Sequence, residues 1–152
     1  PESRKKLPRF SRFRGRHSSK EMFGAVWSWA GRYRGVELNI GVAPHRIREE
    51  TAKLCDDVWF WGSEAEDPPS VLERACRIHH RLAWIHPFRN GNGRHARLIA
   101  DIYLKSYGEP MPVWPSTDIA RKGGVRDEYL AALRAGDQGD FKPLMSLVSG
   151  FS

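Results

Sequence analysis

The stretch HPFRNGNGRHAR, residues 86–97, decides the fold because it places a short glycine-rich loop between two helical patterns. Before it, residues from about 70 to 85 repeat apolar side chains at helical spacing. Pro87 then forces His86 out of the right-handed helical region, so the first helix ends there. The helical pattern resumes at about Arg94. We therefore expect a helix, a loop and a second helix at the centre of the chain.

This loop has the chemistry of an anion site. Free backbone N–H groups at a helix N-terminus attract phosphate, and glycines let the main chain approach it closely. Arg94 and Arg97, three residues apart, can add forked donors from the same turn. His86, at the other end of the loop, is a residue type suited to general-base catalysis near neutral pH. A base facing a phosphate cradle favours attack by a hydroxyl on phosphorus, but on the residues alone a glycine-rich turn with incidental charges is an equal alternative.

The rest of the chain also shows helical patterns. Apolar periodicity predicts helices at about 19–30, 45–61, 125–135 and 141–149, and Ser-x-x-Glu capping boxes open the helices near residues 19 and 70. The segment RYRGVELNIGVAP, residues 32–44, is too short and too rich in glycine for a helix. It predicts a small β-hairpin or an extended flap. We expect an all-α helical bundle with a small β-hairpin flap beside the loop.

Composition and charge predict one domain with a basic arm. The chain has 152 residues and is 40% hydrophobic, which suffices for one core. Its net charge of +7 lies entirely within residues 1–20, and the remainder is balanced. We expect a basic arm over residues 1–18 and a domain over residues 19–150. If the protein binds nucleic acid, we expect it to do so only through this arm. Because neither a long apolar run nor a signal sequence is present, we expect a cytoplasmic protein without membrane contact.

Most aromatic residues are predicted to pack inside the domain. His79 is expected in the core and His80 on the surface, because the histidine spacing is no recognised zinc pattern. Trp114, in a proline-rich turn, is the candidate for lining an adenine pocket. Core packing is predicted for the other tryptophans, Trp27, Trp29, Trp59, Trp61 and Trp84, and buried, reduced thiols for Cys55 and Cys76.

Residues 86–97 resemble the signature of the Fic (filamentation induced by cAMP) domain family of the Fic/Doc superfamily. That signature is His-x-Phe-x-(Asp or Glu)-Gly-Asn-Gly-Arg-x-x-Arg, and the chain matches every specified position except the acidic one, where Asn90 stands. WAGRYR with the following ELNIG resembles the segment that enters the family's flap, and YLAALRAGDQGDFKPL resembles the segment that closes the domain. The similarity covers roughly residues 20–150 and is greatest to the subgroup called mobile mystery protein B.

The resemblance implies a protein adenylyltransferase that moves AMP from ATP to a Ser, Thr or Tyr hydroxyl of a target protein. His86 would be the base, and Phe88 would anchor the loop in the core. Gly93 would favour nucleotidyl transfer, since the Doc branch, which phosphorylates, has Lys there. The resemblance implies that Gly91, Asn92 and Gly93 form an anion hole around the α- and β-phosphates. It implies that Arg94 contacts the β-phosphate and Arg97 the γ-phosphate.

The flap would pin an extended segment of the target protein beside the site by strand addition. Its implied residues are Val36, Glu37, Leu38, Asn39, Ile40 and Gly41. The family's inhibitory pattern, (Ser/Thr)-x-x-x-Glu-(Gly/Asn), is not found in this sequence. Any inhibition would then come from a separate inhibitory or antitoxin-like protein or from residues outside this chain.

Asn90 departs from the family at its metal ligand. The usual acidic residue holds Mg²⁺, whereas an amide oxygen can still ligate the ion but without a charge. Two alternatives therefore stay open beside AMP transfer. One is a catalytically weak or silent module that binds nucleotide or phosphate and regulates a partner, and the other is transfer of another phosphate-containing group.

Overall fold

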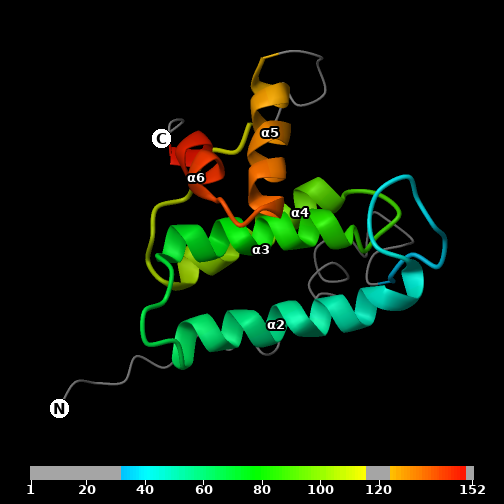
Figure 1. The fold of residues 1–152 in the computed structure, drawn as a ribbon, viewed down its shortest axis with the longest axis horizontal. Helices are drawn as coiled ribbons and strands as arrows, with labels where there is room; N and C mark the ends of the chain where they lie inside the picture. Colours follow the sequence, from blue (N-terminus) through cyan, green and yellow to red (C-terminus); the bar gives the residue numbers. More distant parts are fainter. Residues whose placement is uncertain (1–31, 116–123, 150–152) are drawn as a thin grey trace. The chain divides into compact units, whose positions relative to one another are not determined.

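A computed structural model describes residues 32–115 and 124–149, which are helical apart from their connecting loops. The elements are the 3₁₀ turn η2 (Pro44–Arg46) and the helices α2 (Ile47–Ser63), α3 (Val71–Ile85), α4 (Asn92–Ser106), α5 (Val125–Asp137) and α6 (Lys142–Ser149) (Figure 1). The all-α prediction is confirmed, and each of these helices lies close to its predicted range. The predicted helix at 19–30 and the basic arm lie outside the described residues.

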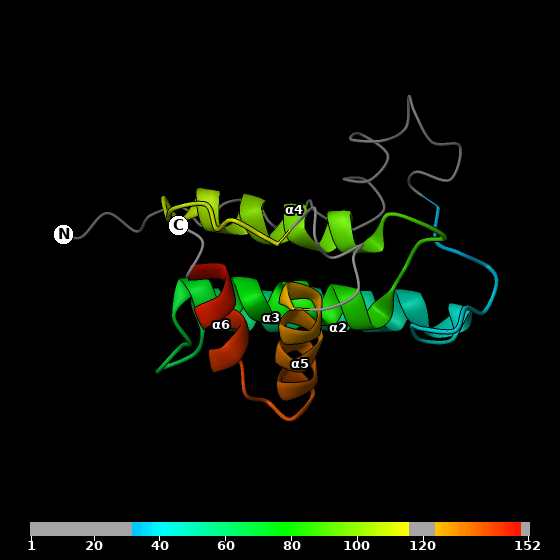
Figure 2. The ribbon, with the colours of Figure 1, turned by 90° about the horizontal axis from the view of Figure 1, so that it is seen from above.

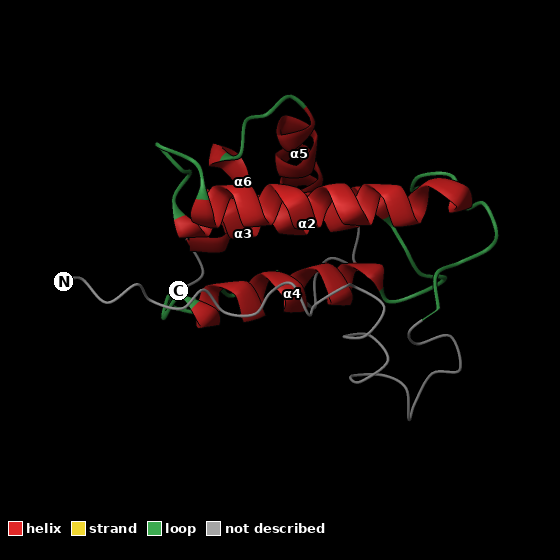
Figure 3. Ribbon diagram, turned by 90° about the horizontal axis from the view of Figure 1, so that it is seen from below, coloured by secondary structure: helices red, strands yellow, loops and turns green. Residues whose placement is uncertain are grey.

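The predicted β-hairpin is not observed. Among the described residues no strand forms, and residues 32–43 are a loop with bends (Figure 3). The Arg34 side chain explains the difference, because it donates hydrogen bonds to the carbonyl oxygen of Val36 at 3.0 Å and to that of Val42. The two ends of the flap are therefore joined through one side chain rather than through a ladder of backbone hydrogen bonds.

The chain divides into two compact units, one made of Pro1–Pro68 and Leu82–Asn92 and the other of Pro69–Arg81 and Gly93–Ser152. In the first unit, α2 buries a stripe that includes Ile47, Leu54 and Val58. Val42 and Ile85 pack with Ile47 in a small core, with Tyr33 against it. This core lies directly beneath the flap and the end of α3.

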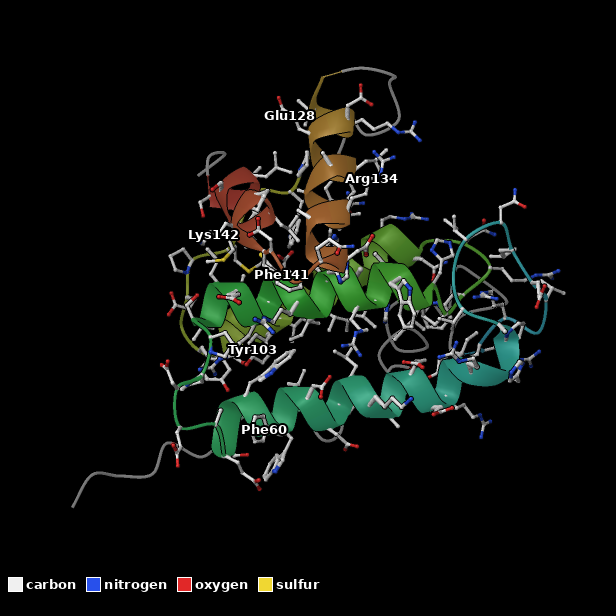
Figure 4. All side chains as sticks on the ribbon, viewed as in Figure 1. Phe60, Tyr103, Glu128, Arg134, Phe141 and Lys142 are labelled. Carbon is white, nitrogen blue, oxygen red and sulfur yellow. The ribbon has the colours of Figure 1, made fainter. Side chains whose placement is uncertain are left out.

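In the second unit, α5 and α6 lie side by side (Figure 2). Phe141, in the turn between them (Figure 4), contacts the edge of the His80 ring at 5.4 Å between centroids. A Cβ added at Gly136 would lie 2.8 Å from His80 Cδ2, so the absence of a side chain there makes room for the imidazole. His80 is consequently only 14% exposed, with Nε2 2.8 Å from the Asp137 carboxylate, and its prediction as a surface residue was wrong.

The prediction that the tryptophans pack in the core was wrong for Trp59 and Trp84, which are 56% and 43% exposed. Trp59 directly follows Val58, and one residue turns a helix by about 100°, so its side chain leaves the buried stripe. Trp84 leaves the buried positions Leu82 and Ile85 in the same way. Trp27 and Trp29 lie outside the described residues.

The predicted capping box at residue 70 is confirmed. Ser70 Oγ accepts a hydrogen bond from the Glu73 amide at 3.2 Å, as a capping box requires. Within the described residues neither cysteine forms a disulfide; the predicted burial is confirmed for Cys76, where it raises the pKa of the thiol to about 12, but Cys55 is only half-buried. No helix within residues 32–115 and 124–149 combines the length and apolar character needed to cross a bilayer.

Candidate active site

His86 occupies the turn that ends α3. Its φ of +52° lies in the left-handed region, which residues with a Cβ adopt rarely. The turn closes the helix through a hydrogen bond from the His86 amide to the Leu82 carbonyl at 3.0 Å, and Pro87 prevents any further helical turn. An uncommon backbone conformation of this kind persists only where the surrounding structure enforces it, and such residues cluster at functional sites.

The surroundings of His86 favour the neutral form of its imidazole. Burial lowers its pKa, a hydrogen bond with the Ala83 backbone opposes this, and the positive charge of Arg34 lowers the pKa further. The Ala83 contact raises the pKa, which means that it favours the protonated ring. It is therefore a hydrogen bond in which a ring N–H of His86 donates to a backbone carbonyl oxygen. The other ring nitrogen then keeps its lone pair, which is the state that a general base requires.

The flap leaves its apolar side chains in solvent. Val36, Leu38 and Ile40 are 44%, 38% and 61% exposed. They stand at alternating positions, and Glu37 and Asn39 between them are exposed as well. These predicted target-binding residues are therefore all on the surface of the first unit, where an added peptide segment could reach them.

Residues 88–92 form a compact loop fixed by one amide side chain. Asn92 is 3% exposed; its Oδ1 accepts a hydrogen bond from the Phe88 amide at 2.8 Å, and its Nδ2 donates to the Phe88 carbonyl at 2.7 Å. Phe88 itself is fully buried, as the sequence predicts, and its ring lies 5.9 Å from that of Tyr33. The Asn92 side chain thus holds the loop closed by bonding to Phe88. An anion at this site would therefore be bound by the backbone N–H of Asn92 rather than by its side chain.

The residue at the predicted metal position points away from the core of this unit. Asn90 is exposed, whereas Gly91, the next residue, has a φ of +73° that suits glycine. Within the described residues no cluster of three or more His, Cys, Asp or Glu side chains could hold a metal ion. The Asn90 side chain offers one neutral amide oxygen as a ligand.

The first turns of α4 carry the predicted phosphate-binding residues. The helix starts at Asn92, two residues earlier than predicted, so Gly93 lies in its first turn. Arg94 is exposed and Arg97 is half-buried, with Arg97 Nη2 4.0 Å from where a Cβ on Gly93 would stand. The first N–H groups of a helix have no partner within the helix, and here they lie beside two arginines and an open glycine, so this segment is suited to an anion.

Trp114, the candidate for an adenine pocket, is a core residue of the second unit. It is 8% exposed, its ring stacks on His79 at 4.4 Å between centroids, and its indole N–H donates to Asp101 at 2.7 Å. Its most direct role in the structure is therefore packing. The prediction that His79 lies in the core is confirmed, since it is fully buried with Nε2 2.7 Å from the Tyr129 hydroxyl.

Sequence reasoning missed Arg34. It is 3% exposed although charged, and it contacts the carbonyl oxygens of Ile85 and His86 as well as the flap. In the sequence it stands among other basic residues in RYRG, and neither periodicity nor a motif separates it from solvent-exposed arginines. Its burial depends on a fold in which residues about 50 positions apart meet.

Comparison with known proteins identifies the family. The sequence profile described as the Fic/DOC family matches residues 13–104, so the chain belongs to the Fic/DOC family. A curated relative named protein adenylyltransferase fic-1, from Caenorhabditis briggsae, is 32% identical over 127 residues, which cover 81% of this chain and 23% of that protein. A relative named uridine 5'-monophosphate transferase, from Xanthomonas campestris, is 37% identical over 82 residues, covering 51% of this chain and 15% of that protein.

A solved structure supports the fold. The structure of residues 134–508 of Fic-1 from C. elegans superposes with a TM-score of 0.69 and 27% sequence identity, covering 90% of this chain and 38% of that one. The chain therefore spans about a quarter of the length of the curated relative and well under half of this solved structure.

Proposed function

We propose that this chain is the transferase domain of a protein adenylyltransferase, which moves AMP from ATP onto a Ser, Thr or Tyr hydroxyl of a target protein. The observation that carries the proposal is the turn at His86. It holds a neutral imidazole, half-buried and fixed by its backbone, directly before a loop that ends in a helix N-terminus. The names of the relatives add support, because proteins similar over most of this chain are called adenylyltransferases.

The chemistry follows from the groups present. His86 takes the proton of the target hydroxyl, and the oxygen attacks the α-phosphorus of ATP. The bond from that phosphorus to the oxygen bridging the α- and β-phosphates breaks, and pyrophosphate leaves. Backbone N–H groups of Gly91, Asn92 and Gly93 stabilise the charge on the phosphates, with Arg94 on the β-phosphate and Arg97 on the γ-phosphate. The flap over residues 36–41 holds the target segment in place by backbone pairing.

The donor set fits Mg²⁺ only as an ion that arrives with ATP. One exposed amide oxygen on Asn90 is far fewer than the six ligands that Mg²⁺ requires, so phosphate oxygens and water would supply the rest. Bound there, the ion would neutralise phosphate charge. Because the amide of Asn90 carries no charge, the affinity for the metal would depend mainly on the nucleotide.

A second candidate is transfer of UMP, which the uridine 5'-monophosphate transferase relative favours. The proposed anion hole contacts phosphates, which ATP and UTP share, so it would not distinguish these two nucleotides. A third is regulation by nucleotide binding without transfer, which the neutral Asn90 favours.

Labelled nucleotides separate these functions in one experiment. The chain is incubated with a cell lysate and Mg²⁺ in three reactions, containing [α-³²P]ATP, [γ-³²P]ATP or [α-³²P]UTP, and labelled proteins are resolved on a gel. Each reaction is compared with lysate lacking the chain, because kinases in the lysate label proteins from [γ-³²P]ATP. We expect label that depends on the added chain from [α-³²P]ATP alone, and none of it when His86→Ala replaces the parent. Label from γ-labelled ATP alone would mean phosphorylation, and label from UTP alone would mean UMP transfer. ATP binding without label in any reaction would replace the proposal with the regulatory module.

The segments outside the site have separate proposed roles. We place the transferase domain at residues 19–150 and the basic arm at residues 1–18, and any nucleic-acid contact would belong to the arm. An inhibitor, where one exists, would be a separate antitoxin-like protein.

A further inference from the structure

Among the described residues, Arg34 is a buried charge whose hydrogen-bond partners are backbone carbonyl groups. Arg34 is 3% exposed, and within the described residues its guanidinium forms no ion pair. Its Nε donates to the His86 carbonyl at 2.7 Å, Nη1 to the Val36 carbonyl at 3.0 Å, and Nη2 to the carbonyls of Val42 and Ile85, the latter at 3.3 Å. Burying a guanidinium is costly, so this many matched acceptors indicate a specific site for it.

The four acceptors belong to two different parts of the first unit. Val36 and Val42 lie at the two ends of the flap, whereas Ile85 and His86 end α3. The last carbonyls of a helix have no partner within the helix and lie at the negative end of its dipole, so a cation is favourable there. Two backbone hydrogen bonds reinforce the junction, from the Arg34 amide to the Pro87 carbonyl at 2.9 Å and from the Val42 amide to the Ile85 carbonyl at 3.2 Å.

Gly41 shows independently how closely the flap fits this turn. A Cβ at Gly41 would lie 2.5 Å from Arg34 Nη2, 2.7 Å from His86 Cβ and 3.0 Å from the Ile85 carbonyl oxygen. Its φ of +98° also disfavours any other residue. The end of the flap therefore lies directly against the side chain of the proposed base.

We propose that Arg34 is a positioning residue that holds the target-binding flap and the His86 base in one fixed arrangement. The hydrogen bond to the His86 carbonyl orients the left-handed peptide from which the imidazole projects, and the bonds to Val36 and Val42 fix both ends of the flap relative to it. The target hydroxyl and the base are then aligned by the same side chain. The activity part of this inference rests on the proposed function, but the structural coupling does not.

Two substitutions at Arg34 separate its geometry from its charge. Arg34→Lys keeps the positive charge but cannot supply the forked set of donors, and Arg34→Gln removes both. Gly41→Ala disturbs the same junction from the flap side without changing any charge. Arg32→Gln, at an exposed arginine two residues away, is the matched control for loss of one positive charge.

The first measurement needs no transfer activity. In the full chain without nucleotide, hydrogen exchange of the Val42 amide and the pKa of the His86 imidazole are followed by NMR. We expect Val42 exchange to accelerate at least tenfold in Arg34→Lys, Arg34→Gln and Gly41→Ala, but not in Arg32→Gln. Burial lowers the pKa of His86, the Ala83 backbone raises it, and the positive charge of Arg34 lowers it. The pKa should therefore rise in Arg34→Gln and change little in Arg34→Lys.

The second measurement is transfer itself. We expect kcat to fall about 10–100-fold in Arg34→Lys and Gly41→Ala, because small misplacements of reacting groups cost rates of this order. The dissociation constant for ATP should stay within about twofold, since the phosphate-binding loop is untouched. In Arg34→Gln the acid limb of the rate profile should also move to higher pH, because the base must be neutral to act.

The outcomes distinguish this inference from the proposed function. Parental Val42 exchange and parental kcat in folded Arg34→Lys and Gly41→Ala would overturn the positioning role. A parent chain that transfers no nucleotide would overturn the proposed function, while the exchange and titration data would still decide whether Arg34 couples the flap to His86. Should Arg34→Gln fail to fold, the Lys and Gly41→Ala variants decide the matter by the same two measurements.

Discussion

Two histidines seven residues apart, one within α3 and one in the turn that ends it, have opposite environments. His79 is fully buried, stacked on Trp114 and paired with the Tyr129 hydroxyl, and burial with the charge of Arg97 lowers its pKa to about 3. His86 is half-buried in a left-handed turn, and its pKa is lowered as well. Burial of the ring therefore does not distinguish a base from a core residue. The distinction lies in the backbone, which is regular at His79 and held in an uncommon conformation at His86.

The comparison is sharpest when each histidine is removed. His86→Ala should lower the rate of nucleotidyl transfer by about 10²–10⁴-fold, because a positioned base contributes factors of this size. The melting temperature and the ATP affinity should change little, since the half-buried ring makes few contacts in the ground state. Initial rates with labelled ATP, together with thermal melts, test this. Equal rates for variant and parent would end the assignment of His86.

His79→Ala should show the reverse pattern. It removes a fully buried ring from between Trp114 and Tyr129 and leaves a cavity and a hydroxyl without its partner. We expect the free energy of unfolding to fall by about 3 kcal/mol, as for other large-to-small core changes. Urea denaturation measures this, and transfer per folded molecule should stay at the parental rate. An unchanged denaturation midpoint, or a loss of rate in fully folded protein, would contradict the core role.

The sequence predicted the helices and the loop because both depend on local signals. Apolar periodicity, the capping box at Ser70 and the Pro87 stop act over a few residues, and the structure confirms them. It did not predict the buried Arg34, the packing of Trp114 on His79 or the partial burial of His80. Each of these depends on residues far apart in the chain, namely Arg34 with His86, Trp114 with His79, and His80 with Gly136 and Asp137. Within the site, residue types were therefore predictable, but the contacts that position them were not.

The pH dependence of stability should report on His79 rather than on His86. Burial lowers the pKa of His79 to about 3 and that of His95 to about 4, so the folded chain stays unprotonated where the unfolded chain takes up protons near pH 6.5. The free energy of unfolding should therefore fall as the pH drops below 6.5, by about 1.5 kcal/mol for His79 between pH 6.5 and 5. His79→Gln keeps a polar partner for Tyr129 but cannot titrate. Its free energy of unfolding should therefore fall less over the same pH range.

Urea denaturation of both proteins at pH 6.5, 6.0, 5.5 and 5.0 checks this expectation. His86→Ala serves as the control, because its ring is only half-buried and its removal should alter the slope less. Parallel curves for the parent and His79→Gln would show that His79 takes up protons in the folded state over this range, and so that it is not the buried group described here.

The smallest effect on transfer is expected for substitution of Asn90. Unlike the two histidines, this residue is exposed, and its proposed contact with Mg²⁺ forms only when nucleotide is bound. Asn90→Asp changes an amide to a carboxylate of nearly the same shape and adds a charge that favours Mg²⁺. Because the side chain is exposed, the substitution should leave stability unchanged. We expect transfer to rise several-fold at limiting Mg²⁺, and the gain to shrink as Mg²⁺ increases, since saturation with the ion removes the advantage of tighter binding.

The effect of the added carboxylate charge must be distinguished from that of a charge elsewhere and from chemical change in the parent protein. Gln138→Glu adds the same charge at an exposed position that closes α5, in the other unit, and should leave the Mg²⁺ dependence of transfer unchanged. Asn90-Gly91 is a pair prone to deamidation, so the mass of the parent must be checked, because a trace of converted protein would pass for parental activity. A folded Asp variant that binds ATP yet is no faster at any Mg²⁺ concentration would show that residue 90 does not contact the ion. Transfer would then depend on metal held by the phosphates alone, and the acidic residue of the family signature would have no equivalent in this chain.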